Sequence, residues 1–127
     1  MSRDHRKLRI FKLADSLVMD IYKITKAFPD DERYGLTSQL RRAAVSSASN
    51  IVEGCARRSE REYGNFLNIA NGSACEARYV LSIALRLEYL GLSTVAPLER
   101  RYSTLIGGLV SLINSLQLDQ ANPEPYQ

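Results

Sequence analysis

Apolar residues recur at helical spacing in the first segment of the chain, from about Lys7 to Ala27. They follow one another at alternating intervals of four and three residues, which places them on one face of an α-helix. Polar residues fall off this stripe, so we expect an amphipathic helix. Pro29 is expected to end it, because the residue before a proline is pushed out of the helical region. The stripe consists of Ile10, Ala14, Leu17, Ile21, Ile24 and Phe28.

The second segment, from about Tyr34 or Leu36 to about Ala56, places small and apolar residues on two sides of a helix. A helix with apolar groups on two sides usually packs against two neighbours, and a second copy of the chain can supply one of them. The first side, which is rich in small residues, allows a close helix contact. It holds Leu36, Leu40, Ala43, Ser47, Ile51 and Gly54, whereas the opposite side holds Val45, Ala48 and Val52.

A third helix is predicted to begin at Ser59, since Ser59 and Glu62 have the spacing of a capping box. We expect it to end near Tyr89 or Leu90, with Gly91 in the left-handed stop conformation. Its predicted inward stripe holds Phe66, Ile69, Ser73, Ala77, Val80, Ala84 and Leu87.

A fourth helix is expected after Ser93 or Thr94 as its N-cap, with Pro97 in the first turn, where the missing amide of proline is tolerated. The pair Gly107 and Gly108 weakens helix propensity by about 1 kcal/mol per glycine, so close packing is the expected compensation. A seam with heptad character runs along this helix. It holds Leu98, Tyr102, Leu105, Leu109, Leu112 and Leu116.

Four helices with short connections predict an all-α, up-down-up-down four-helix bundle, which we assign to residues 1–118. Residues 119–127 contain Pro123 and Pro125 and no apolar period, so a disordered C-terminal tail is expected. Of 127 residues, 45% are hydrophobic and 24% are charged, which is typical of one globular domain and excludes wholesale disorder.

Several features favour a cytoplasmic protein. The chain has no run of about 18 apolar residues, so no membrane span is expected. Residues 1–9 are basic, but no long apolar run follows them, so we expect no secretory signal. Two cysteines, Cys55 and Cys75, are too few for a disulfide framework and suit a reducing compartment.

The residue types argue against an enzyme, a metal site or a bound cofactor. The single histidine, His5, lies outside the predicted bundle, and the chain has no Glu-x-x-His pair for a di-iron site. Cys55 and Cys75 lack a plausible histidine base for nucleophilic catalysis. The sequence has no glycine-rich phosphate loop. A remote alternative is an enzyme that uses Glu53 and Glu62 as paired carboxylates.

Charge is distributed unevenly: residues 1–61 hold 13 Lys/Arg against 8 Asp/Glu, whereas residues 62–127 hold 4 against 6. A basic half attracts polyanions, of which nucleic acid is the commonest in a cytosol. Arginine suits this role because its planar fork matches phosphate and stacks on bases. The turn between the second and third helices is the leading candidate, since a loop is exposed by default. The candidate contacts are Arg57, Arg58 and Arg61, with Arg41, Arg42, Lys7 and Arg9 as secondary contacts.

A polar stripe lies between the two apolar sides of the second helix. It is either a solvated face or a hydrogen-bonded seam between helices or subunits. As a seam it must be fully paired, because an unmet buried donor or acceptor costs about 1–3 kcal/mol. The stripe holds Gln39, Arg42, Ser46, Asn50 and Glu53, to which we add Glu62 of the third helix as a candidate interface residue.

The block from Tyr34 to Ser46, followed by Ser49-Asn50-Ile51 and Glu53-Gly54, resembles the signature of four-helix bundle proteins encoded within 23S rRNA intervening sequences. Arg58-Ser59, Glu62-Tyr63, Phe66-Leu67 and Gly72-Ser73 with Glu76 continue the resemblance, which covers roughly residues 6–117. Two departures bear on packing. Ser47-Ala48 replaces a common Ile-Pro, so a straighter second helix is expected, and Ala74 and Ala77 replace leucines, which implies a locally thinner core or a closer helix contact.

This resemblance implies a bacterial, cytosolic bundle that assembles as a ring, specifically a homopentamer, with no enzymatic activity attached to the family. Related accessory proteins of diversity-generating retroelements are similar pentameric bundles that bind nucleic acid through a basic surface. The genetic location inside rRNA genes suggests a connection with RNA.

Two hypotheses of different classes follow. The leading one is a non-enzymatic homo-oligomer that binds rRNA or another structured nucleic acid through its arginines. The competing one is a protein-interaction scaffold whose arginines form ion pairs between subunits and which has no nucleic-acid role.

Overall fold

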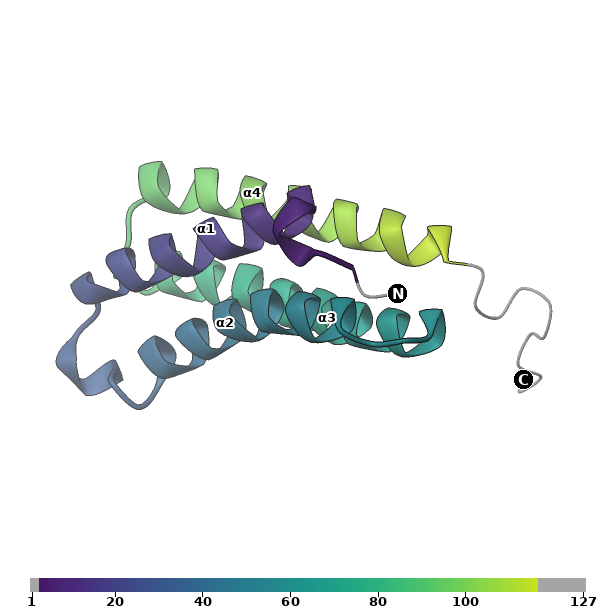
Figure 1. Cartoon of the computed structure of the whole chain (residues 1–127). Coiled ribbons are helices and arrows are strands. Elements are labelled where there is room, and N and C mark those ends of the chain that lie inside the picture. The colour runs from purple at the N-terminus through teal and green to yellow at the C-terminus, as the bar shows by residue number, and fades with distance from the viewer. Residues whose placement is uncertain (1–2, 117–127) are drawn as a thin grey trace, which may run out of the picture.

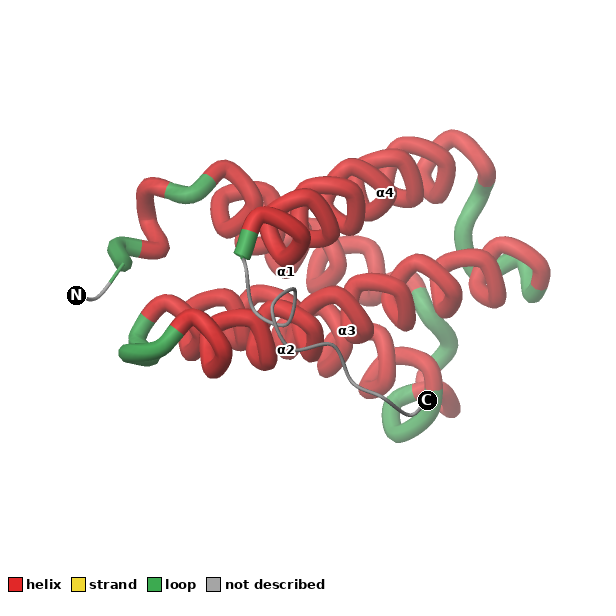
Figure 2. The backbone as a smooth tube through the Cα atoms, turned by 90° about the vertical axis from the view of Figure 1, so that its right-hand side faces the viewer, coloured by secondary structure: helices red, strands yellow, loops and turns green. Residues whose placement is uncertain are grey.

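The computed structural model describes residues 3–116, which form four α-helices joined by short connections (Figure 1). Successive helices run antiparallel, and the fourth returns beside the first to close the bundle (Figures 1 and 2). The predicted all-α four-helix bundle is confirmed, whereas the predicted tail at 119–127 and the domain boundary at 118 lie outside the described residues. The helices are α1 (Arg9–Ile24), α2 (Leu36–Cys55), α3 (Glu60–Arg86) and α4 (Leu92–Ser115).

Helix α1 is shorter at both ends than the predicted span of Lys7 to Ala27. A 3₁₀ turn, η1 (His5–Lys7), precedes it, and the extended backbone of Leu8 separates the two. At the other end the chain tightens into η2 (Thr25–Ala27), where the Thr25 hydroxyl donates to the Ile21 carbonyl at 2.7 Å. Short 3₁₀ turns are frequent at helix termini. The predicted stripe is largely confirmed, with Ala14, Leu17, Ile21 and Phe28 buried and Ile10 and Ile24 partly buried.

Helix α3 begins as predicted, because the Glu62 amide donates to the hydroxyl of the N-cap Ser59 at 3.1 Å. Its predicted end near Tyr89 or Leu90 is wrong. The helix ends at Arg86, and Glu88, not Gly91, takes the left-handed conformation, with φ of 63°. The amides of Glu88 and Tyr89 donate back to the carbonyls of Leu85 and Ala84, the pattern of a Schellman motif.

Because α3 ends early, α4 also begins earlier than predicted. Gly91 is extended and forms its N-cap, and the amides of Thr94 and Val95 donate to the Gly91 carbonyl. Neither Ser93 nor Thr94 is therefore the cap. Pro97 lies in the second turn rather than the first, where its missing amide leaves one carbonyl of the preceding turn without an intrahelical donor.

The buried ridge of α3 differs from the predicted inward stripe. Ile69 and Leu87, both predicted inward, are 51% and 50% exposed. Alanines lie in the core instead, because a helix face of small side chains can pack closely against its neighbour. The spacing of large residues alone does not reveal such a face. Three residues of the predicted stripe are buried as expected: Ala77, Val80 and Ala84. The ridge also holds Tyr63, Gly64, Leu67, Ala70, Ala74 and Leu81. Ala74 and Ala77 are completely buried.

Core positions on α2 and α4 follow the predicted pattern closely. On α2 the predicted small-residue side is buried from Leu40 to Gly54. Of the predicted opposite side only Ala48 is buried, whereas Val45 is exposed and Val52 is partly buried. On α4 the first four positions of the seam are buried, whereas Leu112 and Leu116 are only partly buried. No helix within residues 3–116 is long and apolar enough to cross a membrane.

Candidate nucleic-acid interface

The turn between α2 and α3 presents the leading candidate arginines at one end of the bundle. Helix α2 closes with hydrogen bonds from the amides of Ala56 and Arg57 to carbonyls of its last turn, at 3.2 and 3.0 Å. Ser59 then caps α3 at once. This short, internally bonded turn leaves Arg58 and Arg61 with exposed side chains.

The N-terminal segment docks on this turn. The Arg3 amide donates to the Cys55 carbonyl at 3.1 Å, and its guanidinium donates to the Arg57 carbonyl at 3.3 Å. The same guanidinium lies over the Tyr63 ring, 4.0 Å from its centroid. Carbonyls at a helix C-terminus lack intrahelical donors, so Arg3 satisfies α2 while it adds a cation to the turn.

Lys7 and Arg9 lie farther along the same segment, with exposed side chains on η1 and on the first residue of α1. Asp4 begins η1 by accepting a hydrogen bond from the Arg6 amide at 3.0 Å, and its carboxylate also pairs with the Arg6 guanidinium at 2.9 Å. This side-chain hydrogen bond lowers the pKa of Asp4. The segment is therefore a structured, basic strip.

We call residues 3–9 and 53–62 together the basic end. It contains seven Lys/Arg and four Asp/Glu, an excess equal to the +3 formal net charge of the whole chain. Within it, Arg57 lies 3.8 Å from the Glu53 carboxylate and 5.7 Å from the Phe66 ring centroid. Since both members of that ion pair are partly exposed, the pair is weak. The Nε of Arg57 is buried without a hydrogen-bond partner, so only the outer part of its guanidinium is accessible.

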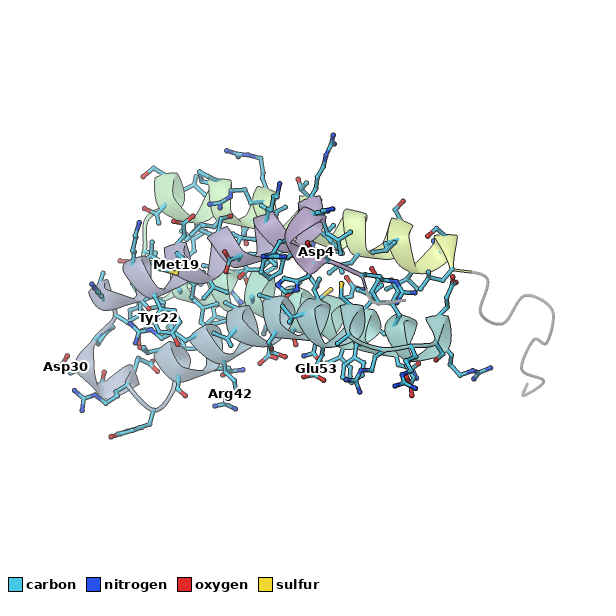
Figure 3. All side chains as sticks on the ribbon, in the orientation of Figure 1. Asp4, Met19, Tyr22, Asp30, Arg42 and Glu53 are labelled. Atoms are coloured by element: carbon cyan, nitrogen blue, oxygen red, sulfur yellow. The ribbon has the colours of Figure 1, made fainter. Side chains whose placement is uncertain are left out.

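Arg41 and Arg42 lie apart from the basic end. They are about 15 residues before the turn, which corresponds to roughly 22 Å along α2. Figure 3 shows Tyr22 and Arg42 toward the Asp30 end of the bundle, away from Glu53. Arg41 already contacts α1, because its Nε donates to the Thr25 hydroxyl at 2.8 Å and its guanidinium stacks on Tyr22. The structure therefore divides the predicted contacts into two groups.

The cysteine and the histidine considered for catalysis, Cys55 and His5, are held in packing contacts. Cys55 is buried against the docked segment, and burial raises the pKa of its thiol, which disfavours the reactive thiolate. Burial likewise raises the pKa of Tyr63 to about 12. His5 packs edge-on against Phe11, with ring centroids 4.7 Å apart. Residues 3–116 contain no group of three or more His, Cys, Asp or Glu that could hold a metal ion.

Comparison with known protein families gives a match over most of the chain. The model of the 23S rRNA-intervening sequence protein family matches residues 6–111, most of the chain. The protein belongs to this family.

A crystal structure of a protein of unknown function from the S23 ribosomal protein family, from Bacteroides thetaiotaomicron, has a similar fold. Its TM-score is 0.74 at 23% sequence identity, over 82% of this chain and 97% of that chain. A comparison with curated proteins finds no match.

The block that carries the likeness to the 23S rRNA-intervening sequence family forms α2, and its polar stripe runs along the groove between α2 and α3. The Ser46 and Ser73 hydroxyls are hydrogen-bonded at 2.8 Å across the two helices. Gln39 donates to the Glu76 carboxylate at 3.3 Å, and Asn50 donates to the Ser46 carbonyl at 2.8 Å. The first two contacts form a polar seam between α2 and α3, whereas the third lies within α2. Gln39, Arg42 and Glu53 are exposed, so part of the stripe is a solvated face.

Other members of the predicted stripe are used differently. Arg42 donates to the Ser38 hydroxyl at 3.3 Å and lines a small hollow of about 150 Å³ beside the seam. Glu53 pairs with Arg57, and the Glu62 amide is bound by the α3 cap. Sequence reasoning missed Arg3 and Ser73 as parts of these sites. The basic composition of residues 1–9 was the available signal for Arg3, whereas only helix packing brings Ser73 opposite Ser46.

Proposed function

We propose that the protein is a cytoplasmic, non-enzymatic homo-oligomer that binds RNA, or another structured nucleic acid, through the basic end. The observation that carries this proposal is the docking of Arg3 on the α2–α3 turn, which adds the N-terminal cations to the turn arginines. A fixed array of cations matches the spaced phosphates of a nucleic-acid backbone, and such contacts supply most sequence-independent affinity.

Exposed apolar side chains support the homo-oligomeric part of the proposal. Large apolar side chains are exposed on α1, such as Met19, and on α3 and α4, such as Ile69 and Leu92. Exposed apolar side chains on different helices suit the head-to-tail contacts of a closed ring, and a homopentamer is the assembly that the family resemblance implies. A ring repeats the basic end, so individually weak phosphate contacts gain from avidity.

The experiment compares two double variants with the same loss of charge. Arg58→Ala/Arg61→Ala removes two cations from the basic end, and Arg86→Ala/Arg100→Ala removes two exposed arginines elsewhere. Binding of rRNA fragments is measured by filter retention across a salt series, and oligomer mass is measured by light scattering. We expect weaker binding for the first double variant alone, with a salt slope smaller by about two per engaged protomer.

Equal losses for the two double variants would contradict the proposal, since net charge alone would then explain binding. The competing function, a scaffold whose arginines pair between subunits, has a different signature. In that case the basic-end variant changes the oligomer mass and leaves RNA retention unaffected.

A further inference from the structure

A second surface with nucleic-acid chemistry lies at the other end of α2. A groove of about 480 Å³ opens between α1, the connection that precedes α2 and the first half of α2. Three arginines line it, and none of its described lining residues is Asp or Glu. Its main lining residues are Tyr22, Arg33, Tyr34, Arg41, Arg42 and Val45.

Tyr34 is the unusual member of this groove. Its side chain is 89% exposed, although it stands between the ordered turn η3 (Asp30–Glu32) and α2. An aromatic ring left in water contributes little to folding, because apolar area stabilises a fold only when it is removed from solvent. The ring therefore adds little to the stability of the fold, and its face is available to stack on a planar ligand.

The opposite wall of the groove is preorganised. The Arg41 guanidinium lies 4.6 Å from the centroid of the Tyr22 ring and is held by the Thr25 hydroxyl. Arg42 is directed along α2 by its hydrogen bond to Ser38. An aromatic face beside fixed guanidinium groups is the combination that binds single-stranded nucleic acid, since the base stacks and the phosphate pairs.

We propose that this groove binds an unpaired nucleotide of a single-stranded segment, with its base stacked on Tyr34 and its phosphate on Arg33 and Arg42. The proposal rests on the proposed function and adds a specificity to it: the basic end attracts phosphates of any strand, and the groove selects unpaired bases. The volume suits this ligand, because small-molecule sites usually span about 300–1,000 Å³.

Fluorescence anisotropy tests this with two labelled probes, a single-stranded oligouridylate and a blunt RNA duplex with the same number of phosphates. The variants are Tyr34→Ala, Tyr34→Phe, which keeps the ring, and Tyr79→Ala, which removes another exposed tyrosine. We expect Tyr34→Ala to weaken binding of the single strand about tenfold and to leave duplex binding unchanged. Tyr34→Phe and Tyr79→Ala should bind both probes as the natural protein does.

Three outcomes overturn the proposal. Tyr34→Ala can leave single-strand binding intact, it can weaken both probes equally, or it can reduce the oligomer mass in sedimentation without a change in RNA affinity. The last outcome would make the groove a contact with a second copy. A labelled polyglutamate bound more tightly than the oligouridylate, with the same dependence on Tyr34, would indicate an acidic peptide instead.

The Arg58→Ala/Arg61→Ala variant separates this proposal from the proposed function. If that variant weakens both probes while Tyr34→Ala weakens neither, the groove proposal is wrong and the basic end remains the binding site. If only Tyr34→Ala weakens the single strand, the groove stands and the basic end does not bind. If the natural protein binds neither probe, both proposals are wrong.

Discussion

The two halves of the bundle are built from side chains of different size. Of the seventeen buried residues on α2 and α3, ten are Ala, Gly or Ser, whereas of the eight on α1 and α4 only Ala14 is small. The distance between packed helices depends on the side chains at the contact, so small residues allow α2 and α3 to approach closely. The α1–α4 half is instead filled by large side chains such as Leu17, Ile21, Tyr102 and Leu105.

This difference explains where polar chemistry lies. Because α2 and α3 are close, the short hydroxyls of Ser46 and Ser73 meet across the contact, and Gln39 reaches Glu76. Both candidate nucleic-acid surfaces involve α2, one at each of its ends. Both halves supply groups to these surfaces, since Arg9 and Tyr22 lie on α1, but α2 is the helix that the two surfaces share.

The largest expected effect comes from a reciprocal change of volume in the two halves. Leu105→Ala removes a fully buried side chain from the half that relies on large residues, and we expect it to reduce the free energy of unfolding by about 2–5 kcal/mol. Ala74→Leu adds the same volume to the close ridge of α3, where overpacking should cost about 1–3 kcal/mol. Urea unfolding followed by circular dichroism measures both changes.

An exposed alanine provides the control for the second variant. Ala56→Leu adds the same three carbons at an exposed position, so its effect should be small. If Ala74→Leu is tolerated as well as Ala56→Leu, the α2–α3 contact is not close-packed and the contrast between the halves is wrong.

The same contrast shows which parts of the fold can be predicted from sequence. Spacing of large apolar residues located the buried face of α4 from Leu98 to Leu109, because large side chains carry the burial there. It failed on α3, where it favoured Ile69 and Leu87 over Ala70 and Ala74. An alanine methyl group has little apolar area, so a ridge of alanines gives a weaker periodic hydrophobic signal than two large residues.

The two ends of α3 also differ in how well the sequence predicts them. The serine cap of α3 was predictable because Ser59 and the amide it binds are three residues apart. The end of α3 was not, because a glycine in the left-handed conformation was expected, whereas Glu88 adopts it. Tyr89, which packs against Phe28 with ring centroids 5.5 Å apart, fixes the chain direction there, and that contact is long-range.

The candidate site was predictable only as a list of cations. The sequence identified the turn arginines, but their division into a basic end and a separate groove depends on the length of α2 and on the docking of Arg3. The residue pattern places Tyr34 only at the start of a predicted helix and of the block that resembles the family. Its isolation from the core is a property of the connection before α2 and has no counterpart in the residue pattern.

A smaller effect, of about 1 kcal/mol, is expected at the glycine pair of α4. A Cβ on Gly107 would meet nothing within 4 Å, so Gly107→Ala should stabilise the protein through helix propensity alone. A Cβ on Gly108 would lie 2.7 Å from Cγ2 of Ile10 on α1, and a β-branched side chain has little freedom to move away. Thermal unfolding of the two variants should therefore give melting temperatures on opposite sides of the natural protein.

If both alanines stabilise the protein equally, α1 and α4 are not in close contact at Ile10. That result would increase the contrast between the two halves, because the α1–α4 half would then depend on large side chains alone. Two double variants test whether the effect is steric. Ile10→Val/Gly108→Ala keeps the clashing methyl group, whereas Ile10→Ala/Gly108→Ala removes it. Only a steric effect predicts that the second double variant is relieved of the cost of Gly108→Ala.

The smallest expected effect concerns pH and the clasp that Glu32 forms in the α2–α3 half. Its carboxylate accepts hydrogen bonds from the Leu36 amide at 2.9 Å and from the Tyr89 hydroxyl at 2.8 Å. The backbone hydrogen bond, and then that of Tyr89, lower the pKa of Glu32 from its ordinary value of 4.5. Because the folded pKa lies below the unfolded one, the clasp stabilises the fold fully above pH 4.5, and its contribution is lost as the pH falls through the lowered value.

Glu32→Gln should be less stable at neutral pH and lose less stability on acidification. Tyr89→Phe keeps the ring against Phe28 but removes the hydroxyl, so its acid dependence should be intermediate. Melting temperatures measured across this acidic range test the order, and parallel curves for the three proteins would show that other carboxylates carry the acid sensitivity.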